Sequence, residues 1–459
     1  MRTGSIILAA GLSKRMNSAT PKVIHPLLGK PLLSYSIEAA KAASDVPPVV
    51  VVGYAGDKVM EAIHAEVQYA FQNEQLGTAH AVMMAEPLLK GTVDQILITS
   101  ADMPLVSANT LRELVKIQSL HDGPMSLVSI LTNDSRGFGR IIRDRSGNAR
   151  AIIEEKVATP EQLTINEFNA GIYCVKSEWL WDALKKVKKS PVGEFFLTDL
   201  LEIAVQANEK VSILQLENVE EAIGINNRVH FAEVEKIMRR QINEKFMLSG
   251  VTMIDPDLVY IDPTVEIGRD SVIYPDSYLR GNTKIGENCT IGPGTIIEDS
   301  SIGNDCRILK SVLEGAELED HVEMGPFCRL RSGAHLASHV HMGNFGEVKK
   351  SYLGKGTKMG HFSYIGDATI GENVNIGAGT ITCNYDGEKK NKTVIGDETF
   401  IGSDTMLVAP VNIGKNAVTG AGAVVTRDVG DGEKVVGVPA HVIKNKKDEE
   451  KEDDKSRKG

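Results

Sequence analysis

The sequence contains no long hydrophobic run. No stretch approaches the roughly 18 consecutive apolar residues that a membrane-spanning helix needs. Residues 1–10 also lack the charged start, long apolar middle and small-residue end of a secretory signal. We therefore expect a cytoplasmic protein with no membrane partner.

Cysteine, aromatic and basic residues are also scarce. The five cysteines include no C-x-x-C pair, which fits neither a disulfide framework nor a structural zinc site. The 51 Lys and Arg against 61 Asp and Glu give a net charge of −10, which disfavours nucleic acid as a partner. Aromatic residues make up 5%, whereas 43 of the 459 residues are glycine, so a large region packs small residues. At about 150 residues per domain, this length predicts two or three domains.

The second half carries an aliphatic residue at every sixth position. The spacing is unbroken from Ile261 to Ile297, and it returns at Val312, Leu318, Met324, Leu330, Leu336, Met342 and Val348, at Leu353, Met359 and Ile365, and at Ile395, Ile401, Leu407 and Ile413. A period of six matches a short strand followed by a tight corner, and three such units close a triangular coil with one aliphatic side chain per unit inside. The pattern resembles the hexapeptide-repeat, left-handed parallel β-helix, and the left hand is taken from that family.

Residues 383–394 interrupt this repeat. A segment that does not fit the coils must leave the prism as a loop, and loops on a rigid scaffold often carry binding residues. Asn384, Tyr385 and Lys390 are therefore candidate site residues.

The first half alternates strand-like and helix-like segments. Apolar runs at 5–8, 48–52, 67–71 and 95–99 are separated by amphipathic stretches such as 32–43 and 78–85. This order predicts an α/β domain with a mostly parallel sheet covered on both faces. In that architecture ligands lie beyond the carboxyl ends of the strands.

Polar and small residues follow the first and fourth of these strands. The first runs into Leu8-Ala9-Ala10-Gly11, followed by Arg15 and Lys22, and such backbone N–H groups and cations suit a triphosphate. The fourth ends at Ser100-Ala101-Asp102, which places a carboxylate where it can hold Mg²⁺. Taken alone, the first stretch is equally a glycine turn with two solvated cations, and Asp102 a turn or cap residue.

Six further segments of the first half, together with the two just described, form a characteristic series of motifs. They are residues 72–78, 137–140, 154–156, 168–171, 193–199 and 225–228. From about residue 4 to about residue 440 the chain resembles the bacterial bifunctional N-acetylglucosamine-1-phosphate uridylyltransferase/glucosamine-1-phosphate N-acetyltransferases. The resemblance implies a Rossmann-like uridylyltransferase domain (1–228), a linker helix (229–249), a β-helix acetyltransferase domain (250–442) and a charged tail (443–459), which we expect to be disordered.

The resemblance also implies two consecutive reactions. Acetyl-CoA acetylates the amine of glucosamine 1-phosphate, and UTP then transfers its uridylyl group to the product with release of pyrophosphate. The result is UDP-N-acetylglucosamine, a precursor of peptidoglycan and lipopolysaccharide. The family implies Mg²⁺ as cofactor and a homotrimer formed through the β-helix, with each acetyltransferase site built from neighbouring chains.

In such a uridylyltransferase the nucleotide contacts would come from Leu8, Ala9, Ala10, Gly11, Lys22, Gln72, Gly77, Thr78, Ser100, Ala101 and Asp102. The sugar contacts would be Gly139, Glu154 and Asn169; Asp102 and Asn227 would hold magnesium, and Arg15 and Lys22 would act on the triphosphate. The chain departs from the usual family pattern at Ser13-Lys14, Ser100-Ala101 and Ala170.

The implied acetyltransferase residues lie in the β-helix. His361 would be the general base, since the attacking amine must lose a proton and imidazole titrates near working pH. Arg331 and Lys349 would bind the sugar phosphate, Tyr364 and Asn375 the sugar, and Ala378, Asn384, Tyr385, Ser403 and Ala421 acetyl-CoA. Gly437 stands where some members carry a basic residue that meets CoA.

Two alternatives remain at this stage. His335, His339 and His341 are similar to the zinc-binding histidines of carbonic anhydrases built on the same prism, although the repeat puts His335 and His341 on one face and His339 out of phase. The second alternative is a monofunctional sugar-1-phosphate nucleotidyltransferase with a regulatory or assembly β-helix. Such enzymes have no counterpart to His361, Tyr364, Asn375 and the 384–385 loop.

Overall fold

The computed structural model describes residues 1–11 and 14–443, which form two compact units. The first unit is Met1–Met238 and the second begins at Arg239. Ser13 lies outside the described residues, as does the expected charged tail from residue 444 onward. Within the described part of the chain, no helix combines the length and the apolar character needed to cross a membrane.

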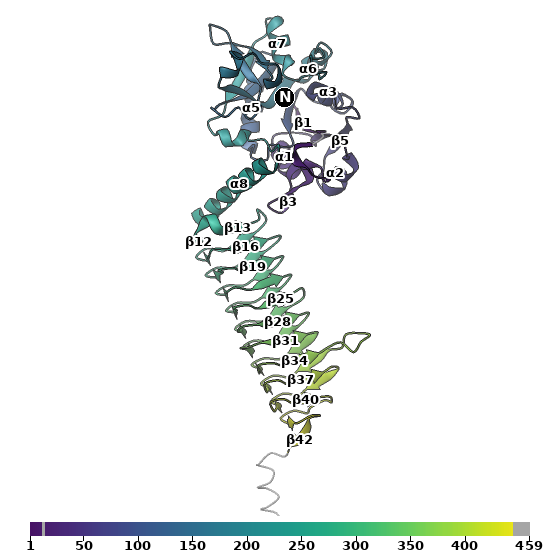
Figure 1. Cartoon of the computed structure of the whole chain (residues 1–459), viewed down its shortest axis with the longest axis vertical. Coiled ribbons are helices and arrows are strands. Elements are labelled where there is room, and N and C mark those ends of the chain that lie inside the picture. The colour runs from purple at the N-terminus through teal and green to yellow at the C-terminus, as the bar shows by residue number, and fades with distance from the viewer. Residues whose placement is uncertain (12–13, 444–459) are drawn as a thin grey trace, which may run out of the picture. The chain divides into compact units, whose positions relative to one another are not determined.

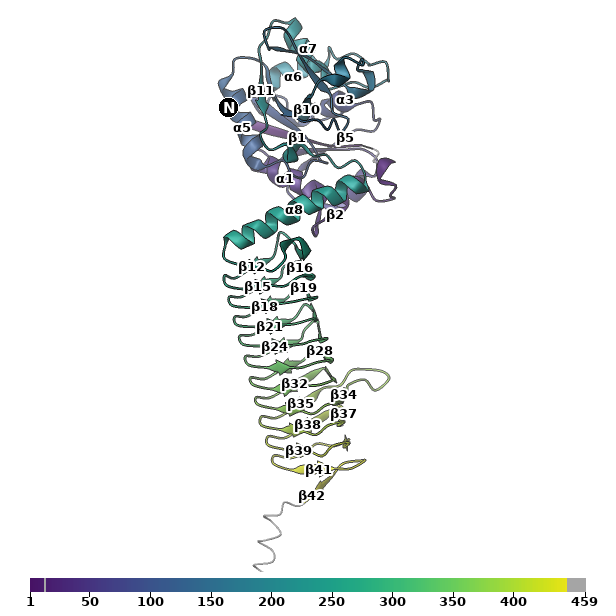
Figure 2. The same cartoon turned by 60° about the vertical axis from the view of Figure 1, so that its left-hand side comes forward.

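The first unit is built on one sheet (Figures 1 and 2). Its main strands follow the order β11 (Val211–Gln215), β7 (Met125–Leu131), β10 (Glu167–Lys176), β6 (Gln95–Ser100), β1 (Thr3–Ala9), β4 (Val49–Val52) and β5 (Gln68–Phe71). Strand β10 runs antiparallel to both of its neighbours, and all other pairs on this path are parallel. The prediction of a mostly parallel α/β sheet is therefore confirmed.

Helices cover both faces because successive strand residues point to opposite sides. Ile6 packs in one core with α3 (Thr78–Met83), α4 (Glu86–Leu89), α6 (Ser177–Leu184) and α7 (Asp199–Gln206). Ile7 packs in another with α1 (Leu32–Lys41) and α2 (Gly56–Ala62), and α5 (Ala108–Leu120) covers β7 and β10 on the same side. Ser107 caps α5 by accepting a hydrogen bond from the N–H of Thr110 (3.1 Å).

The described part of this unit also contains smaller elements. They are the hairpins β2 (Pro26–Leu27)/β3 (Lys30–Pro31) and β8 (Arg140–Arg143)/β9 (Ala149–Ile153), and five 3₁₀ turns at Lys14–Met16, Lys22–Ile24, Glu155–Val157, Gln162–Thr164 and Val219–Ala222. Strand β10 bulges between Asn169 and Tyr173, where Gly171 has a φ of 73°. A bulge redirects side chains locally, and this one lies at a predicted sugar contact.

Helix α8 (Arg228–Leu248) contains the division between the units. Val234 and Met238 belong to a buried cluster of the first unit. Ile242 and Phe246 pack against the core of the second, and Asn243 donates to the carbonyls of Pro256 (2.7 Å) and Val259 (3.0 Å).

The second unit is a stack of triangular coils made of three sheets (Figures 1 and 2). One sheet runs from β12 (Thr252–Met253) to β41 (Lys434–Val436) and ends in the antiparallel β42 (His441–Ile443). The second runs from β13 (Val259–Ile261) to β40 (Val424–Val425), and the third from β14 (Glu266–Ile267) to β38 (Val411–Ile413). One buried side chain per strand fills the prism, as at Ile273, Leu279 and Ile285, which confirms the predicted β-helix.

The predicted spacing is wrong at Val312. The inward residue there is Leu313, which is fully buried, whereas Val312 is only half-buried. The buried residues of this region are Ile297, Ile302, Ile308, Leu313 and Leu318. Three of the four intervals between them are five residues long instead of six. A shorter corner shifts the register without breaking the stack.

The predicted placement of His335 and His341 on one face is also wrong. His335 belongs to β26 (His335–Leu336) and His341 to β27 (His341–Met342), which are strands of different sheets. His339 instead stacks on His321, with ring centroids 4.7 Å apart. The reason is that six residues advance the chain by one face of the triangle. Among the described residues, no group of three or more His, Cys, Asp or Glu side chains could hold a metal ion.

Candidate active sites

A cavity of about 570 Å³ opens at the carboxyl ends of β1, β5 and β6. It brings together all the predicted nucleotide and triphosphate contacts, namely Leu8, Ala9, Ala10, Gly11, Arg15, Lys22, Gln72, Gly77, Thr78, Ser100, Ala101 and Asp102. Gln75, Lys156, Glu194 and Asn226 also line it, and sequence reasoning did not single these out. Each lies inside one of the quoted segments, but a motif does not say which member faces the cavity.

Lys22 and Asp102 form the polar centre of this cavity. Lys22 Nζ lies 2.6 Å from Asp102 Oδ2 and donates to the carbonyl of Ile225 (2.7 Å), while Ser100 Oγ donates to Asp102 Oδ1 (2.7 Å). Burial by itself would raise the pKa of Asp102, but the Lys22 ammonium and the hydrogen bonds hold it below its ordinary value. The carboxylate is therefore held in its ionised form.

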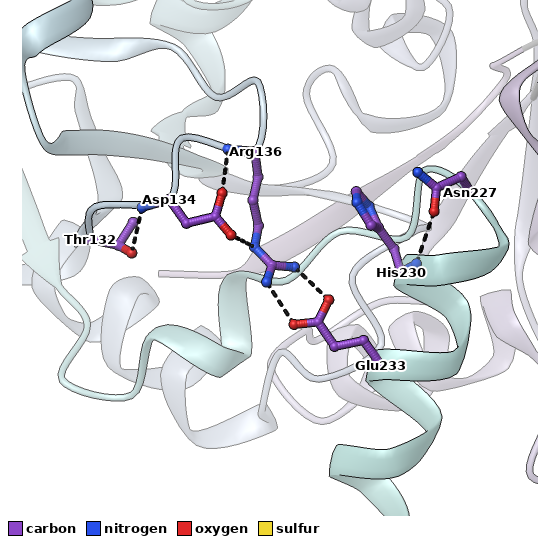
Figure 3. Close-up of polar contacts among 6 residues, drawn as sticks. All are labelled: Thr132, Asp134, Arg136, Asn227, His230 and Glu233. Carbon is purple, nitrogen blue, oxygen red and sulfur yellow. Dashed lines mark hydrogen bonds and ion pairs between the residues drawn. The ribbon is translucent and has the colours of Figure 1, made fainter.

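Two asparagines at the start of α8 have different surroundings. Asn226 lines the cavity and its Oδ1 accepts from Arg15 Nη2 (2.8 Å). Asn227 does not line it, and its Oδ1 accepts from the backbone N–H of His230 (2.9 Å; Figure 3). The predicted magnesium contact Asn227 thus stands next to a cavity residue and stabilises the first turn of α8.

Gly77 is a lining residue of the cavity at which two backbone segments meet. Its φ is 110°, and a Cβ there would lie 2.7 Å from the backbone nitrogen of Phe195. Around this contact Phe195 N–H donates to Leu76 O (2.7 Å), Ala79 N–H donates to Phe195 O (3.0 Å) and Leu197 N–H donates to Thr78 Oγ1 (2.9 Å). Only glycine allows two backbone segments to meet this closely.

We expect Gly77→Ala to lower the free energy of unfolding by about 1–3 kcal/mol, because a Cβ forces an unfavourable φ and a backbone clash. Chemical denaturation measures this loss. Gly91→Ala is the matched control, since Gly91 has a φ of 73° with open space around its Cβ. Equal losses in both variants would show that the contact with Phe195 is unimportant.

Three predicted sugar contacts lie together, and none of them is among the residues that line the cavity. Gly139 accepts a backbone hydrogen bond from Asn169 (2.8 Å), and a Cβ on Gly139 would approach the carboxyl carbon of Glu154 to 3.7 Å. Asn169 Nδ2 donates to the hydroxyl of Tyr173 (2.6 Å). Burial raises the pKa of Glu154, although Thr198 donates a hydrogen bond to it (3.2 Å).

An ion pair anchors the loop that leads into Gly139. Figure 3 shows Arg136 reaching α8, where its Nη1 and Nη2 lie 3.1 and 2.6 Å from the two carboxylate oxygens of Glu233. Its Nε donates to Asp134 (2.9 Å). This bidentate contact fixes the loop to the helix that begins beside Asn227.

The second site occupies one sheet of the prism. Arg331 on β25 (Arg329–Arg331) pairs with Lys349 on β28 (Gly346–Lys349), and Lys349 pairs with Gly366 on β31 (Ser363–Gly366). A Cβ on Gly366 would lie 2.5 Å from Tyr364 Oη and 2.7 Å from Asn384 Nδ2. The missing side chain therefore leaves room for two predicted ligand-binding groups beside the cations.

Positive charge gathers around Lys349. The Arg331 guanidinium and then the Lys390 ammonium lower the pKa of Lys349, because each disfavours another cation nearby. Arg331 has one acidic partner, with its Nη1 3.2 Å from Glu347 Oε1. Such a cluster favours a bound anion.

His361 stands at an exposed corner of the prism, after β30 (Lys358–Met359) and before β31. Ala378, Ser403 and Ala421 occupy the same corner position in the following coils, each two residues after the register partner of Met359. Backbone hydrogen bonds link these corners. The N–H of Gly379 donates to the carbonyl of Phe362 (2.6 Å), that of Asp404 to Ala378 (2.6 Å) and that of Gly422 to Ser403 (2.8 Å). The predicted base and three predicted acetyl-CoA contacts thus form one column.

The insertion leaves the stack after β34 (Ile381–Cys383) and projects from its side (Figures 1 and 2). Asn384 is 6% exposed and donates to Asp367 Oδ2 (2.6 Å), whereas Tyr385 is 59% exposed. The loop is closed by Asp386, whose pKa falls to about 2 because the N–H groups of Lys389 and Glu388 donate to it.

Asn375 is not brought into this group. It lies on β33 (Asn375–Ile376), in the sheet on the other side of the His361 corner from Tyr364. Side chains on two outer faces of a prism diverge from their shared corner. One chain therefore does not enclose a ligand that touches both Asn375 and Tyr364.

Comparisons with known proteins match both units. A MobA-like NTP transferase domain model matches residues 5–137, and a bacterial transferase hexapeptide model matches residues 264–299 and 392–427. The bifunctional protein GlmU of Caldanaerobacter subterraneus subsp. tengcongensis is 47% identical over 429 residues, which cover 93% of each chain. That of Thermosipho africanus is 46% identical over 440 residues, or 96% of this chain and 95% of the relative.

The chain belongs to the GlmU family of bifunctional proteins. Membership confirms the predicted fold class, a Rossmann-like nucleotidyltransferase followed by a left-handed β-helix of hexapeptide repeats. It likewise confirms the predicted enzyme of UDP-N-acetylglucosamine biosynthesis, a uridylyltransferase and an acetyltransferase in one chain. The GlmU match spans both candidate sites.

Proposed function

We propose that uridylyl transfer takes place in the cavity of the first unit and acetyl transfer at the His361 corner of the second. The observation that carries this assignment is common to both sites. In the first unit Asp102 lies beside Lys22, and Arg15 lines the same cavity. In the second, His361 precedes β31, and the neighbouring strands β28 and β25 carry Lys349 and Arg331.

In the first unit UTP would lie with its phosphates along residues 8–11 and its base toward Gln72 and Gly77. Arg15 and Lys22 neutralise charge as the oxygen of N-acetylglucosamine 1-phosphate attacks the α-phosphorus and pyrophosphate leaves. Gly139, Glu154 and Asn169 hold the sugar, and Lys156 and Glu194 close the cavity beside them. The protein contributes positioning and charge, because phosphoryl chemistry needs little else.

The residues at the polar centre fit Mg²⁺. The ionised carboxylate of Asp102 is a hard oxygen ligand, and Mg²⁺ typically takes one or two protein oxygens and completes its shell with phosphates and water. Asn227 would join it by releasing the N–H of His230. A bound Mg²⁺ would neutralise charge on the phosphates during the transfer.

In the second unit Arg331 and Lys349 would bind the phosphate of glucosamine 1-phosphate. His361 would take the proton that the amine loses as it attacks the thioester of acetyl-CoA. Tyr364 and Asn375 would hold the sugar, and Ala378, Asn384, Tyr385, Ser403 and Ala421 would contact acetyl-CoA. The small side chains of Ala378, Ser403 and Ala421 leave the column below His361 open to such a long ligand.

We further propose a cytoplasmic homotrimer whose acetyltransferase sites are shared between chains. Asn375 and Tyr364 face different sides of the corner, so a second chain would complete the site. Phe327, Phe345 and Phe362 stand at one corner position in successive coils and are 53%, 59% and 56% exposed. Contiguous exposed aromatic rings of this kind favour protein association. Sedimentation of the purified chain at three times the 49.7 kDa monomer mass is the expected result, and a monomer contradicts it.

A coupled assay tests the function as a whole. The purified chain receives acetyl-CoA, glucosamine 1-phosphate, UTP and Mg²⁺, and free thiol and pyrophosphate are followed separately. We expect thiol first and pyrophosphate second. Pyrophosphate that appears only after N-acetylglucosamine 1-phosphate is added would favour the monofunctional alternative and remove the role of His361.

Lys349→Ala is expected to raise the KM for glucosamine 1-phosphate about tenfold, because one charge-assisted contact to the phosphate is lost. Thiol release at varied substrate concentration measures it. Lys284→Ala, an exposed lysine paired with Glu266 on the same prism, serves as control. An unchanged KM in Lys349→Ala would show that the phosphate binds elsewhere.

A further inference from the structure

The amide of Gln72 is held by two neighbours at the edge of the cavity. Gln72 follows β5 directly, is 3% exposed and lines the cavity. Its Nε2 lies 3.0 Å from the carbonyl oxygen of Gly77 and 3.0 Å from Nδ1 of His80.

These two contacts fix the orientation of the amide. A backbone carbonyl can only accept, so the Gln72 atom beside Gly77 O must be the NH₂ group. Its second N–H then points to His80, whose Nδ1 must accept and whose ring proton is therefore on Nε2. Among the described residues no donor contacts Gln72 Oε1, which is left as the acceptor that Gln72 offers to a ligand in the cavity.

We propose that His80 is a positioning residue that sets the choice of pyrimidine through Gln72. An Oε1 directed at the ligand accepts from a base edge that has a ring N–H, as uracil has at N3. Cytosine has a lone pair at N3, and two acceptors facing each other repel. The inference rests on the proposed function, in which Gln72 lies beside the base of UTP.

The backbone around His80 is held in place by its neighbours, which limits how far the imidazole ring can move away from Gln72. His80 is the third residue of α3, which starts at Gly77 and Thr78 against residues 195–197. On either side of it Ala79 is fully buried and Ala81 nearly so. The backbone of Gln72 is held as well, with its N–H on Val52 O (2.8 Å) and its carbonyl accepting from Gln75 Nε2 (3.3 Å).

Loss of the ring nitrogen would leave only Gly77 to orient the amide. The side chain could then turn its NH₂ toward the ligand more often and accept cytosine. Loss of a single hydrogen bond of ordinary strength corresponds to a change of about 3- to 10-fold in the preference for UTP over CTP. We expect this change in KM rather than in kcat, because the base is remote from the reacting phosphorus.

The test compares His80→Leu with His80→Asn, two side chains of nearly equal shape. Asparagine can accept through Oδ1 at the position of Nδ1, and leucine cannot. The readout is kcat/KM for UTP divided by kcat/KM for CTP, from pyrophosphate release with N-acetylglucosamine 1-phosphate and Mg²⁺. His80→Leu should lower this ratio about 3- to 10-fold, and His80→Asn should keep it within about twofold.

Several outcomes overturn the inference. They are an unchanged ratio in His80→Leu, an equal loss with both nucleotides, or an Asn variant that behaves like the Leu variant. In a Gln72→Leu background, His80→Leu should not change the ratio further, and a further change would contradict an action through Gln72. A wild-type chain that shows no preference for UTP over CTP would instead overturn the proposed nucleotide, whatever the variants do.

A second measurement reports on the ring of His80 in the wild-type chain itself. The ¹⁵N spectrum of the full-length wild-type chain in alkaline buffer, assigned by comparison with His80→Asn, reports which ring nitrogen carries the proton. We expect a protonated Nε2 and an unprotonated Nδ1 for His80. A protonated Nδ1 would contradict the proposed hydrogen bond.

Discussion

Replacement of His361 by alanine should lower acetyl transfer by about 10²- to 10⁴-fold and leave uridylyl transfer unchanged. The amine of glucosamine 1-phosphate is protonated in solution and must give up a proton to attack the thioester. In the described part of the second unit, His361 is the histidine at the column of Ala378, Ser403 and Ala421. Thiol release and pyrophosphate release on one preparation measure the two activities.

His341→Ala is the control for this experiment. His341 is likewise exposed on the prism, and its Nδ1 lies 3.2 Å from Glu323, away from the corner column. It should retain both activities. Full acetyl transfer in His361→Ala would remove its role as base, and an equal fall in both activities would indicate unfolding.

Replacement of Asp102 by asparagine should have the opposite effect, a loss of uridylyl transfer with acetyl transfer intact. The asparagine keeps an oxygen for Ser100 and Lys22 but removes the charge that a cation needs. Loss of metal assistance is worth several kcal/mol, so a fall of 10²-fold or more is expected at low Mg²⁺ concentration. Pyrophosphate release measured over a range of Mg²⁺ concentrations should show activation displaced to higher concentrations.

The Asp102→Asn variant also loses an ion pair with Lys22, so its fold must be checked alongside its activity. The Lys22–Asp102 pair is mostly buried, with side chains 13% and 23% exposed. Because the pKa of Asp102 lies below its ordinary value, the ion pair stabilises the fold at neutral pH and is lost only as the pH falls through that lowered pKa. Asp182→Asn, which removes an exposed carboxylate beside Lys185, should change neither activity. Unchanged Mg²⁺ dependence in Asp102→Asn would contradict the assigned cation site.

The β-helix core could be predicted from the sequence because one residue per face decides it. Leu330, Leu336 and Met342 follow the expected spacing and are buried. The prediction failed at Val312, because shortened corners move Leu313 inward in its place. A missing corner residue removes no aliphatic residue, so the sequence pattern does not show where the register shifts. The placement of His335 and His341 on one face failed for a geometric reason, since neighbouring hexads lie on different sheets.

The active-site contacts were only partly predictable. Lys22 was expected at the triphosphate and Asp102 at the magnesium ion, but their 2.6 Å contact joins residues 80 positions apart and depends on the sheet order. Asn226, and not the expected Asn227, lines the cavity because the helix cap turns Asn227 toward His230. His80 was not selected at all. Its significance depends on which atom of Gln72 it contacts, and this is a matter of three-dimensional geometry.

Helix α8 also decides how the two activities can be separated by truncation. A fragment that stopped before residue 228 would lose Val234 and Met238 from the core of the first unit. A fragment that began at residue 250 would lose Ile242 and Phe246, and with Asn243 two hydrogen bonds at the first coil of the second. An independent first half must therefore extend at least to Met238, and an independent second half must begin before Ile242, so the cut falls inside α8.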